Sequence, residues 1–253
     1  MTTTRLDKFL TEKAFYSSRE KAREAIRHGL VKVNGNVTTK PSFSVSSEDQ
    51  ITIIKSGNTY VSKGGYKLEK AIREFGIDFN GKTVLDAGAS TGGFTDCALQ
   101  HGAVLVVAVD VGTNQLAATL RKNEKVISLE NTDIRSLSAD QLPQPDFDVV
   151  VADLSFISLE KVIDDLFRFC KPGGEMIVLV KPQFEQQERK NLKNGIVKDE
   201  SMRKAVLERI IRNIGSKRNS SIAYVETDVE DALLKNIEYL LAIRTDQQLL
   251  NHD

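Results

Sequence analysis

Residues 82–244 alternate short apolar runs with stretches of helical periodicity. The runs are apolar at nearly every position, which is typical of strands buried on both faces of a parallel sheet. We predict strands over residues 83–86, 104–110, 127–130, 147–153, 175–180, 222–225 and 239–244. Helices are expected over residues 94–101, 115–122, 159–170 and 203–214. This alternation predicts an α/β domain of Rossmann type, with a doubly wound, mostly parallel sheet.

The first 56 residues follow a different pattern, in which two helical stretches precede short strands. Residues 5–14 place Leu6, Phe9 and Leu10 on one face of a helix. Ser17 as N-cap with Glu20 three residues later predicts the start of a second helix. The inward face of that helix is formed by Ala22, Ala25 and Ile26, and its basic residues are expected to point mostly outward.

Gly29 is expected to end the second helix, and an Asn34-Gly35 turn predicts a hairpin within residues 30–37. Another strand is expected over residues 51–54, and the Ser-Gly-Asn sequence at 56–58 is typical of a linker. We therefore predict a small α+β domain over residues 1–56, a linker over 57–62 and a larger domain over 63–253.

The charges are divided unevenly between these two domains. The chain of 253 residues carries 35 Lys and Arg against 35 Asp and Glu, so its formal net charge is zero. Residues 1–56 hold ten basic and six acidic residues, which gives this part +4 and leaves −4 for the rest. A basic domain favours a polyanionic partner. The candidates for RNA contact are Arg5, Arg19, Arg23, Arg27, Lys32 and Lys63, of which the three α-helical arginines at spacings of four share one helix face; a solvated charged face is the alternative.

Composition excludes several other classes of protein. Two cysteines, Cys97 and Cys170, are too few for a disulfide scaffold, and three scattered histidines show no ligand spacing. The longest apolar run, at residues 103–109, is far shorter than the ~20 residues of a membrane-spanning helix, and the N-terminus lacks the apolar segment of a signal peptide. We therefore expect a cytoplasmic protein with no metal site and no membrane-spanning segment.

The sequence DAGASTGGF at residues 86–94 predicts a cofactor site, because it follows a buried strand and begins a helix. Glycines let the backbone approach a ligand closely, and the next strand ends at Asp110, whose carboxylate can accept both hydroxyls of a ribose. The glycine spacing is G-x-x-x-G-G, unlike that of dinucleotide sites. Asp86 would repel a pyrophosphate but attract an amino group, which favours S-adenosylmethionine. The candidate residues are Asp86, Gly88, Ser90, Thr91, Gly92, Gly93, Phe94, Asp110 and Asp133.

Asp133 follows the third strand, where it could accept a hydrogen bond from the adenine amino group. Capping of a helix is an almost equal alternative for this residue. A structural strand–turn–helix with incidental glycines is the alternative for the whole motif.

Four motifs together resemble the TlyA family of hemolysin-like, FtsJ-type RNA methyltransferases, over nearly the whole chain. They are DAGASTGGFTD, VVADLSFISL, LVKPQFE and YVSKGGYKLEKAI. Residues 5–56, with RLDKFL and SREKAREAIRHGLVKVNG, resemble an S4 RNA-binding domain. The resemblance implies a class I methyltransferase fold and methylation of cytidine 2′-hydroxyls in ribosomal RNA. It also implies a Lys-Asp-Lys-Glu catalytic tetrad, whose matching positions are Lys67, Asp153, Lys181 and Glu238.

The chemistry of the residues agrees with this tetrad. Asp153 and Lys181 end buried strands, where doubly wound sheets bind their ligands. A ribose hydroxyl has a high pKa, so its proton must leave as the methyl group arrives, and a lysine accepts it only if burial or a neighbouring cation lowers the lysine's own pKa. Pro182 holds Lys181 extended. The alternatives are a solvated charge for Lys67, a surface carboxylate for Glu238, a loop cap for Asp153 and a strand-end lysine with its amine in solvent for Lys181.

Two other functions are compatible with the resemblance. The hemolysin name suggests a membrane-damaging protein, although the sequence shows no spanning segment. A ribosome-assembly factor without catalysis would not need the tetrad and the glycine motif. A pseudouridine synthase is rejected, because RLD occurs only at residues 5–7, within the S4-like helix.

Overall fold

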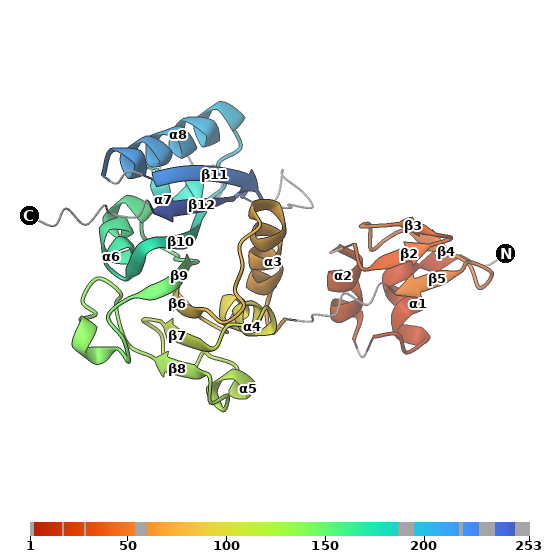
Figure 1. Cartoon of the computed structure of the whole chain (residues 1–253). Coiled ribbons are helices and arrows are strands. Elements are labelled where there is room, and N and C mark those ends of the chain that lie inside the picture. The colour runs from red at the N-terminus through yellow and green to blue at the C-terminus, as the bar shows by residue number, and fades with distance from the viewer. Residues whose placement is uncertain are drawn as a thin grey trace, which may run out of the picture. The chain divides into compact units, whose positions relative to one another are not determined.

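The computed structural model describes residues 3–16, 18–27, 29–53, 60–186, 195–217, 220–227 and 236–245. The chain forms two compact units, Met1–Thr59 and Tyr60–Asp253 (Figure 1). The second unit includes Tyr60 and Ser62, which lie within the linker expected from the sequence; Tyr60 is buried in its core. Our expected end of the preceding strand at residue 54 and the expected start of the linker at residue 57 lie outside the described residues.

The first unit packs two helices against short antiparallel strands. Its elements are β1 (Thr4–Arg5), α1 (Leu6–Glu12), α2 (Arg19–Arg27), β2 (Val31–Val33), β3 (Asn36–Val37), β4 (Ser44–Val45) and β5 (Ile51–Ile53). The sheets have the orders β1-β4 and β3-β2-β5. Leu6, Leu10 and Ile26 are fully buried in the core between them. The predicted small α+β domain is confirmed, with β1 and β4 as strands that the sequence analysis missed.

Turn chemistry sets the ends of these elements. Asn34 and Gly35 both have positive φ, 51° and 82°, as a two-residue hairpin turn requires. Gly29, with φ 69°, follows the end of α2, as predicted. The expected N-cap Ser17 lies outside the described residues, and the hydroxyl of Ser18 accepts a hydrogen bond from the backbone N–H of Lys21.

The second unit is built on a seven-stranded sheet with the order β11-β12-β10-β9-β6-β7-β8. The strands are β6 (Thr83–Ala87), β7 (Leu105–Val109), β8 (Val126–Leu129), β9 (Phe147–Ala152), β10 (Cys170–Val180), β11 (Ser220–Glu226) and β12 (Tyr239–Thr245). All pairs from β8 to β10 are parallel, and β12 lies antiparallel between β10 and β11. The chain runs outward from β6 to β8 and then returns to β9 beside β6. This reversal creates a topological switch point at the carboxyl ends of β6 and β9.

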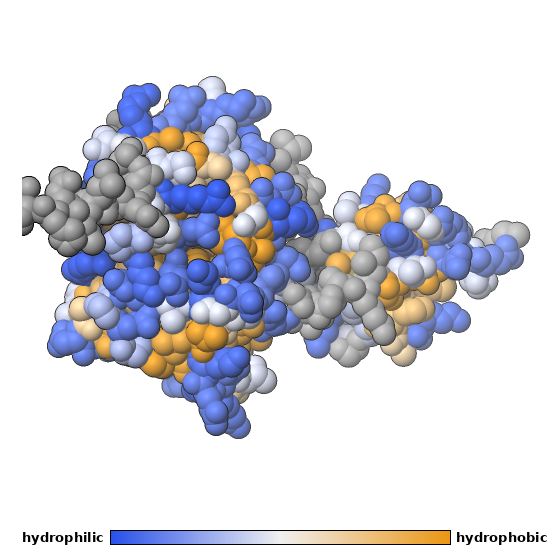
Figure 2. Space-filling model, in the orientation of Figure 1, coloured by the Kyte–Doolittle hydropathy of each residue, from blue (hydrophilic) through white to orange (hydrophobic). Residues whose placement is uncertain are grey.

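Helices cover both faces of this sheet, which confirms the doubly wound arrangement (Figure 1). They are α3 (Lys63–Phe75), α4 (Gly93–Gln100), α5 (Ala118–Arg121), α6 (Ile163–Arg168), α7 (Pro182–Glu185) and α8 (Glu200–Lys217), with short 3-10 turns η1 (Ala139–Gln141) and η2 (Leu159–Lys161). One apolar core includes residues of α3 and α4, and the other includes residues of α6 and α8. Hydrophilic residues cover most of the face drawn in Figure 2.

Two predicted helices are shorter than expected. The helix expected over residues 115–122 is reduced to α5, where Leu120 packs with Leu116 against Ala89 of the glycine loop. The helix expected over 159–170 is divided into η2 and α6, and Cys170 already belongs to β10. The spacing of apolar residues in the sequence does not reveal these breaks, because apolar residues are buried before and after each break and the pattern continues across it.

Candidate active site

The glycine loop after β6 brings its backbone close to two neighbouring elements. Gly88 has φ 82°, and a Cβ placed there would lie 2.9 Å from the backbone oxygen of Asp153. A Cβ at Gly93 would lie 2.8 Å from the backbone nitrogen of Gly65 in α3. Gly88 therefore permits close contact with the end of β9, while Gly93 permits α4 to pack against α3. The second role was not evident from the sequence.

A pocket of about 970 Å³ opens at the carboxyl ends of the parallel strands. Of the predicted site residues, it is lined by Gly88, Ser90, Asp110, Asp133 and Asp153. The other candidate cofactor residues do not line it: Asp86, Gly92, Gly93 and Phe94 are buried, and Thr91 is exposed. The position agrees with the switch point, because β6, β7 and β9 all end there.

Asp110 ties the glycine loop to the end of β7. Its Oδ2 accepts a hydrogen bond from the backbone N–H of Ser90 at 2.8 Å, and its Oδ1 accepts one from the N–H of Gly112 at 2.7 Å. A carboxylate has about four acceptor positions, so both oxygens retain capacity for ligand hydroxyls. Asp110 is thus held in a fixed orientation at the pocket wall.

Asp133 has a protein partner at the pocket. Its Oδ2 lies 2.5 Å from Nη2 of Arg135, and its Oδ1 accepts from the backbone N–H of Arg135 at 2.9 Å. The hydrogen bonds and charge of Arg135 lower the pKa of Asp133. No helix begins at Asp133 in the part of the chain that the structure describes, so this carboxylate caps a turn and not a helix, and it also lines the pocket.

Asp86 lies beneath the glycine loop and is fully buried. Its Oδ2 accepts a hydrogen bond from the hydroxyl of Thr95 at 2.6 Å, while its Oδ1 has no hydrogen-bond partner among the described residues. Burial raises the pKa of Asp86 to about 7, and the nearby carboxylates of Asp153 and Asp110 add to the shift. A cation close to this carboxylate would relieve the shift, which is the property that an amino group of a ligand provides.

The four tetrad positions converge in the structure. The Nζ of Lys181 lies 2.5 Å from Oδ1 of Asp153, and it donates a hydrogen bond to the hydroxyl of Ser155 at 2.9 Å. The Nζ of Lys67, on α3, lies 4.0 Å from Oδ2 of Asp153 and 2.7 Å from Oε2 of Glu238. Asp153 therefore lies between the two lysines. Glu238, the residue immediately before β12, pairs with Lys67 and holds it in place.

Exposure differs across the tetrad. The side chain of Lys181 is 10% exposed, whereas those of Lys67 and Asp153 are 28% and 22% exposed. Two lysines and two carboxylates balance in charge, and the side chain of Lys181 is the least exposed of the four, since that of Glu238 is 15% exposed. Such an arrangement can place a substrate hydroxyl group next to a lysine amine without leaving an unpaired buried charge.

The sequence analysis missed the residues that shape the loop after Asp153. Phe156 has φ 66°, is 90% exposed, lines the pocket, and lies with its ring centroid 5.1 Å from that of Phe184. Glu185 accepts hydrogen bonds from the Ser158 hydroxyl at 2.5 Å and the Leu159 N–H at 2.8 Å, and its burial raises its pKa. Phe156, Phe184 and Glu185 all belong to the motifs quoted above. The hydrophobic periodicity of the sequence does not distinguish them from residues of the core.

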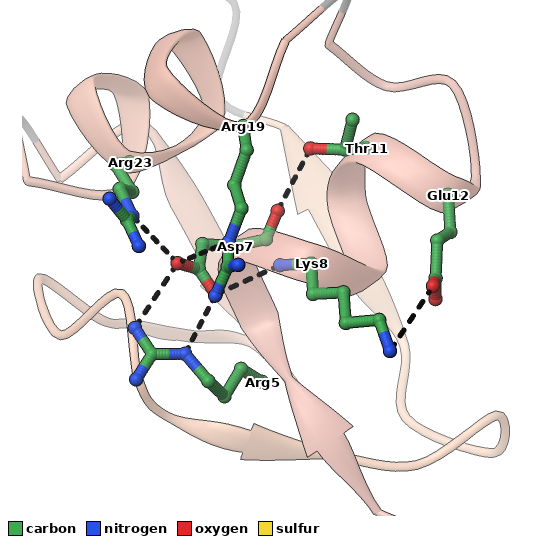
Figure 3. Close-up of polar contacts among 7 residues, drawn as sticks. All are labelled: Arg5, Asp7, Lys8, Thr11, Glu12, Arg19 and Arg23. Carbon is green, nitrogen blue, oxygen red and sulfur yellow. Dashed lines mark hydrogen bonds and ion pairs between the residues drawn. The ribbon is translucent and has the colours of Figure 1, made fainter.

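The RNA-binding candidates are distributed over both units. Arg5, Arg19 and Arg23 converge on Asp7 (Figure 3). We expected Arg19 and Arg23 to point mostly outward; both side chains remain well exposed, and each also turns its guanidinium toward this buried carboxylate. Arg27 and Lys32 are half-buried in the first unit, and Lys63 is exposed at the start of α3 in the second.

Two features bear on the excluded classes. Among the residues that the structure describes, no group of three or more His, Cys, Asp or Glu side chains is placed to hold a metal ion. Within the same residues, no helix combines the length and the apolar character needed to cross a bilayer.

The parallel sheet with one antiparallel strand, the glycine loop and the pocket at the switch point define the second unit as a Rossmann-like methyltransferase domain. A model of FtsJ-like methyltransferases matches residues 60–242, and a model of the S4 domain matches residues 4–51. The chain belongs to the FtsJ-like methyltransferase family, and its first unit is an S4 domain. These matches confirm the family, the fold and the class of enzyme that the sequence predicted.

Named relatives cover nearly the whole chain. The chain is 37% identical to the 16S/23S rRNA (cytidine-2′-O)-methyltransferase TlyA of Mycobacterium tuberculosis, over 95% of this chain and 90% of that protein. It is 37% identical to Hemolysin A of Brachyspira hyodysenteriae, over 93% of this chain and 98% of that protein. A solved structure described as a hemolysin, from Streptococcus thermophilus, matches with a TM-score of 0.70 and 34% identity, over 97% of this chain and 90% of that one.

Proposed function

We propose that this enzyme transfers the methyl group of S-adenosylmethionine to the 2′-hydroxyl of cytidine in ribosomal RNA, in the cytoplasm. The observation that carries the proposal is the convergence of Lys67, Asp153, Lys181 and Glu238 beside the pocket at the switch point. The TlyA relative is named as a methyltransferase for this reaction. The hemolysin names add no second function, since no described feature favours membrane damage.

The residues around the pocket fit S-adenosylmethionine. Gly88 keeps the wall free of side chain, and Asp110 presents a fixed carboxylate for the ribose hydroxyls. Beneath the glycine loop, the Oδ1 of Asp86, which has no hydrogen-bond partner among the described residues, fits a nearby amino group. Asp133 would accept a hydrogen bond from the adenine amino group. When bound, the cofactor supplies an electrophilic methyl group. The remaining candidates Ser90, Thr91, Gly92, Gly93 and Phe94 shape the loop that carries this wall.

The tetrad residues act on the ribose hydroxyl. Asp153 holds the Nζ of Lys181, and Lys67 with Glu238 holds Asp153 from its other side. In this arrangement Nζ of Lys181 removes or orients the 2′-hydroxyl proton as the oxygen attacks the methyl carbon. The exposed ring of Phe156, beside the tetrad, offers a surface on which a base can stack.

The S4 domain docks on the RNA substrate. Its candidate contacts are Arg5, Arg19, Arg23, Arg27 and Lys32, joined by Lys63 in the methyltransferase domain. Contacts between these cations and phosphates release counterions, so RNA affinity should fall steeply with salt.

The test is methylation of ribosomal RNA by the purified full chain. Unmethylated 16S and 23S transcripts, assembled into subunits where necessary, are incubated with labelled S-adenosylmethionine, digested to nucleosides and analysed by mass spectrometry. We expect label in 2′-O-methylcytidine. Label in a base-methylated nucleoside would refute the ribose assignment, and no transfer to either RNA or subunit would refute the substrate.

A further inference from the structure

The S4 domain contains a fully buried carboxylate at the centre of its basic residues. Asp7, in the first turn of α1, is 0% exposed, and its carboxylate is paired with charged side chains. Its oxygens lie 3.0 Å from Nε of Arg5, 3.0 Å from Nε of Arg19 and 2.8 Å from Nε of Arg23. These arginines come from β1 and α2, so Asp7 connects three segments of the domain (Figure 3).

Each arginine binds Asp7 through one edge of its guanidinium group. Arg5 and Arg19 each use Nε and Nη2, and Arg23 uses Nε. The side chains remain 47%, 46% and 40% exposed, so each arginine keeps part of its surface accessible to a ligand. A guanidinium has five N–H donors in a rigid fork, and fixing one edge aims the donors on the other.

The cluster carries excess positive charge. Three arginines around one aspartate leave a net charge of +2. Although burial acts to raise it, hydrogen bonds from Arg5, Arg23 and Arg19 hold the pKa of Asp7 well below its usual range. The backbone N–H of Lys8 also donates to Oδ1 of Asp7, at 2.9 Å, so the carboxylate is saturated by donors.

We propose that Asp7 is a positioning residue that assembles Arg5, Arg19 and Arg23 into one preorganised site for backbone phosphates of the RNA substrate. The inference rests on the proposed function, in which the S4 domain docks on ribosomal RNA. Preorganisation matters because free arginine side chains lose rotamer freedom when they bind, and this loss weakens binding. Asp7 imposes that loss during folding instead, before the RNA arrives.

The positioning role predicts a change in RNA affinity opposite in direction to the change that charge alone predicts. Asp7→Asn raises the net charge of the S4 domain by one, so a purely electrostatic view predicts tighter RNA binding. Positioning predicts weaker binding, because an amide accepts at one atom only and releases the arginine forks. Glu12→Gln is the matched control, since it makes the same charge change on the same helix. Glu12 is 57% exposed and pairs only with Lys8 in the described contacts.

The experiment uses the full chain and 23S and 16S transcripts in a filter-binding assay over a range of salt. We expect Asp7→Asn to weaken binding by about tenfold, the effect of losing one charge-assisted hydrogen-bonding arrangement. Glu12→Gln should bind as tightly as the unaltered protein or slightly more tightly. In methyl transfer, Asp7→Asn should raise KM for RNA and leave kcat unchanged, a split that general loss of folded protein would not produce.

A second variant covers the case in which Asp7→Asn unfolds the S4 domain. Replacing Arg5, Arg19 and Arg23 together by Lys keeps the charge and alters only exposed side chains. We expect a loss of at least about tenfold with the salt dependence unchanged, because lysine lacks the fork. Unchanged or tighter binding by folded Asp7→Asn, or by the lysine variant, would overturn the positioning role. Failure of the unaltered protein to bind RNA would instead overturn docking itself.

Discussion

Replacing Lys181 tests the chemistry most directly. Lys181→Ala removes an amine that is 2.5 Å from Asp153 and leaves Asp153 with Lys67, whose Nζ is 4.0 Å away. Loss of this partner should cost about 1–3 kcal/mol of stability, since Asp153 keeps some solvent and a second cation. The loss of general acid–base help should reduce methyl transfer far more, by about 10²–10⁴-fold.

The assay is single-turnover transfer of labelled methyl to ribosomal RNA, with cofactor affinity measured by calorimetry. Cofactor binding should survive, because the amine contacts Asp153 and Ser155 and not the glycine loop. Lys181→Arg should recover little activity, because a guanidinium stays protonated and cannot act as a base. Activity in the Arg variant alone would leave Lys181 only a charge or orienting role.

A control comes from the opposite end of the same strand. Lys171 lies 2.9 Å from Asp148 at the start of β10, so Lys171→Ala also removes a lysine–aspartate pair. This variant should transfer methyl groups at the normal rate. If Lys181→Ala retained near-normal transfer, or if Lys171→Ala lost as much, the assignment of Lys181 to the chemistry would be refuted.

Three further predictions concern the pocket and the glycine loop beside it. Asp110→Ala should weaken S-adenosylmethionine binding by about tenfold or more, as measured by calorimetry, because a charged hydrogen-bonding group is lost; equal affinity would remove Asp110 from the site. Burial raises the pKa of Asp86 to about 7, so the folded chain holds this proton at a pH where the unfolded chain has lost it. The free energy of unfolding should therefore fall as the pH rises from about 4 to about 7, and Asp86→Asn should remove this part of the dependence in denaturant titrations at several pH values; an identical profile would contradict the shift. Gly88→Ala combines a positive φ of 82° with a contact of 2.9 Å to a backbone oxygen, whereas Gly81→Ala has a φ of 72° and no atom within 4 Å. Gly88→Ala should thus lower both the melting temperature and cofactor affinity, and Gly81→Ala only the melting temperature; equal effects on affinity would refute a specific role for the close approach.

Local sequence patterns determined the framework of this protein. Buried strands are apolar at nearly every position, and glycines and asparagine mark turns that need positive φ, so these features appear within a short window of residues. For the same reason, Asp153 and Lys181 could be placed beside each other: both end parallel strands, and the carboxyl ends of parallel strands meet at one edge of a sheet. The helix breaks around α5 and α6 were missed because they do not interrupt the apolar pattern.

Contacts between distant segments were decided only by the tertiary structure. Lys67 and Glu238 are 171 positions apart and 2.7 Å from each other, because α3 packs beside β12 after the sheet has assembled. Family resemblance suggested this pair, but no spacing in the chain does. The inward turn of Arg19 and Arg23 toward Asp7 has the same origin: helical periodicity places a side chain on a face, but the position of a buried countercharge on another segment decides which way its charged end points.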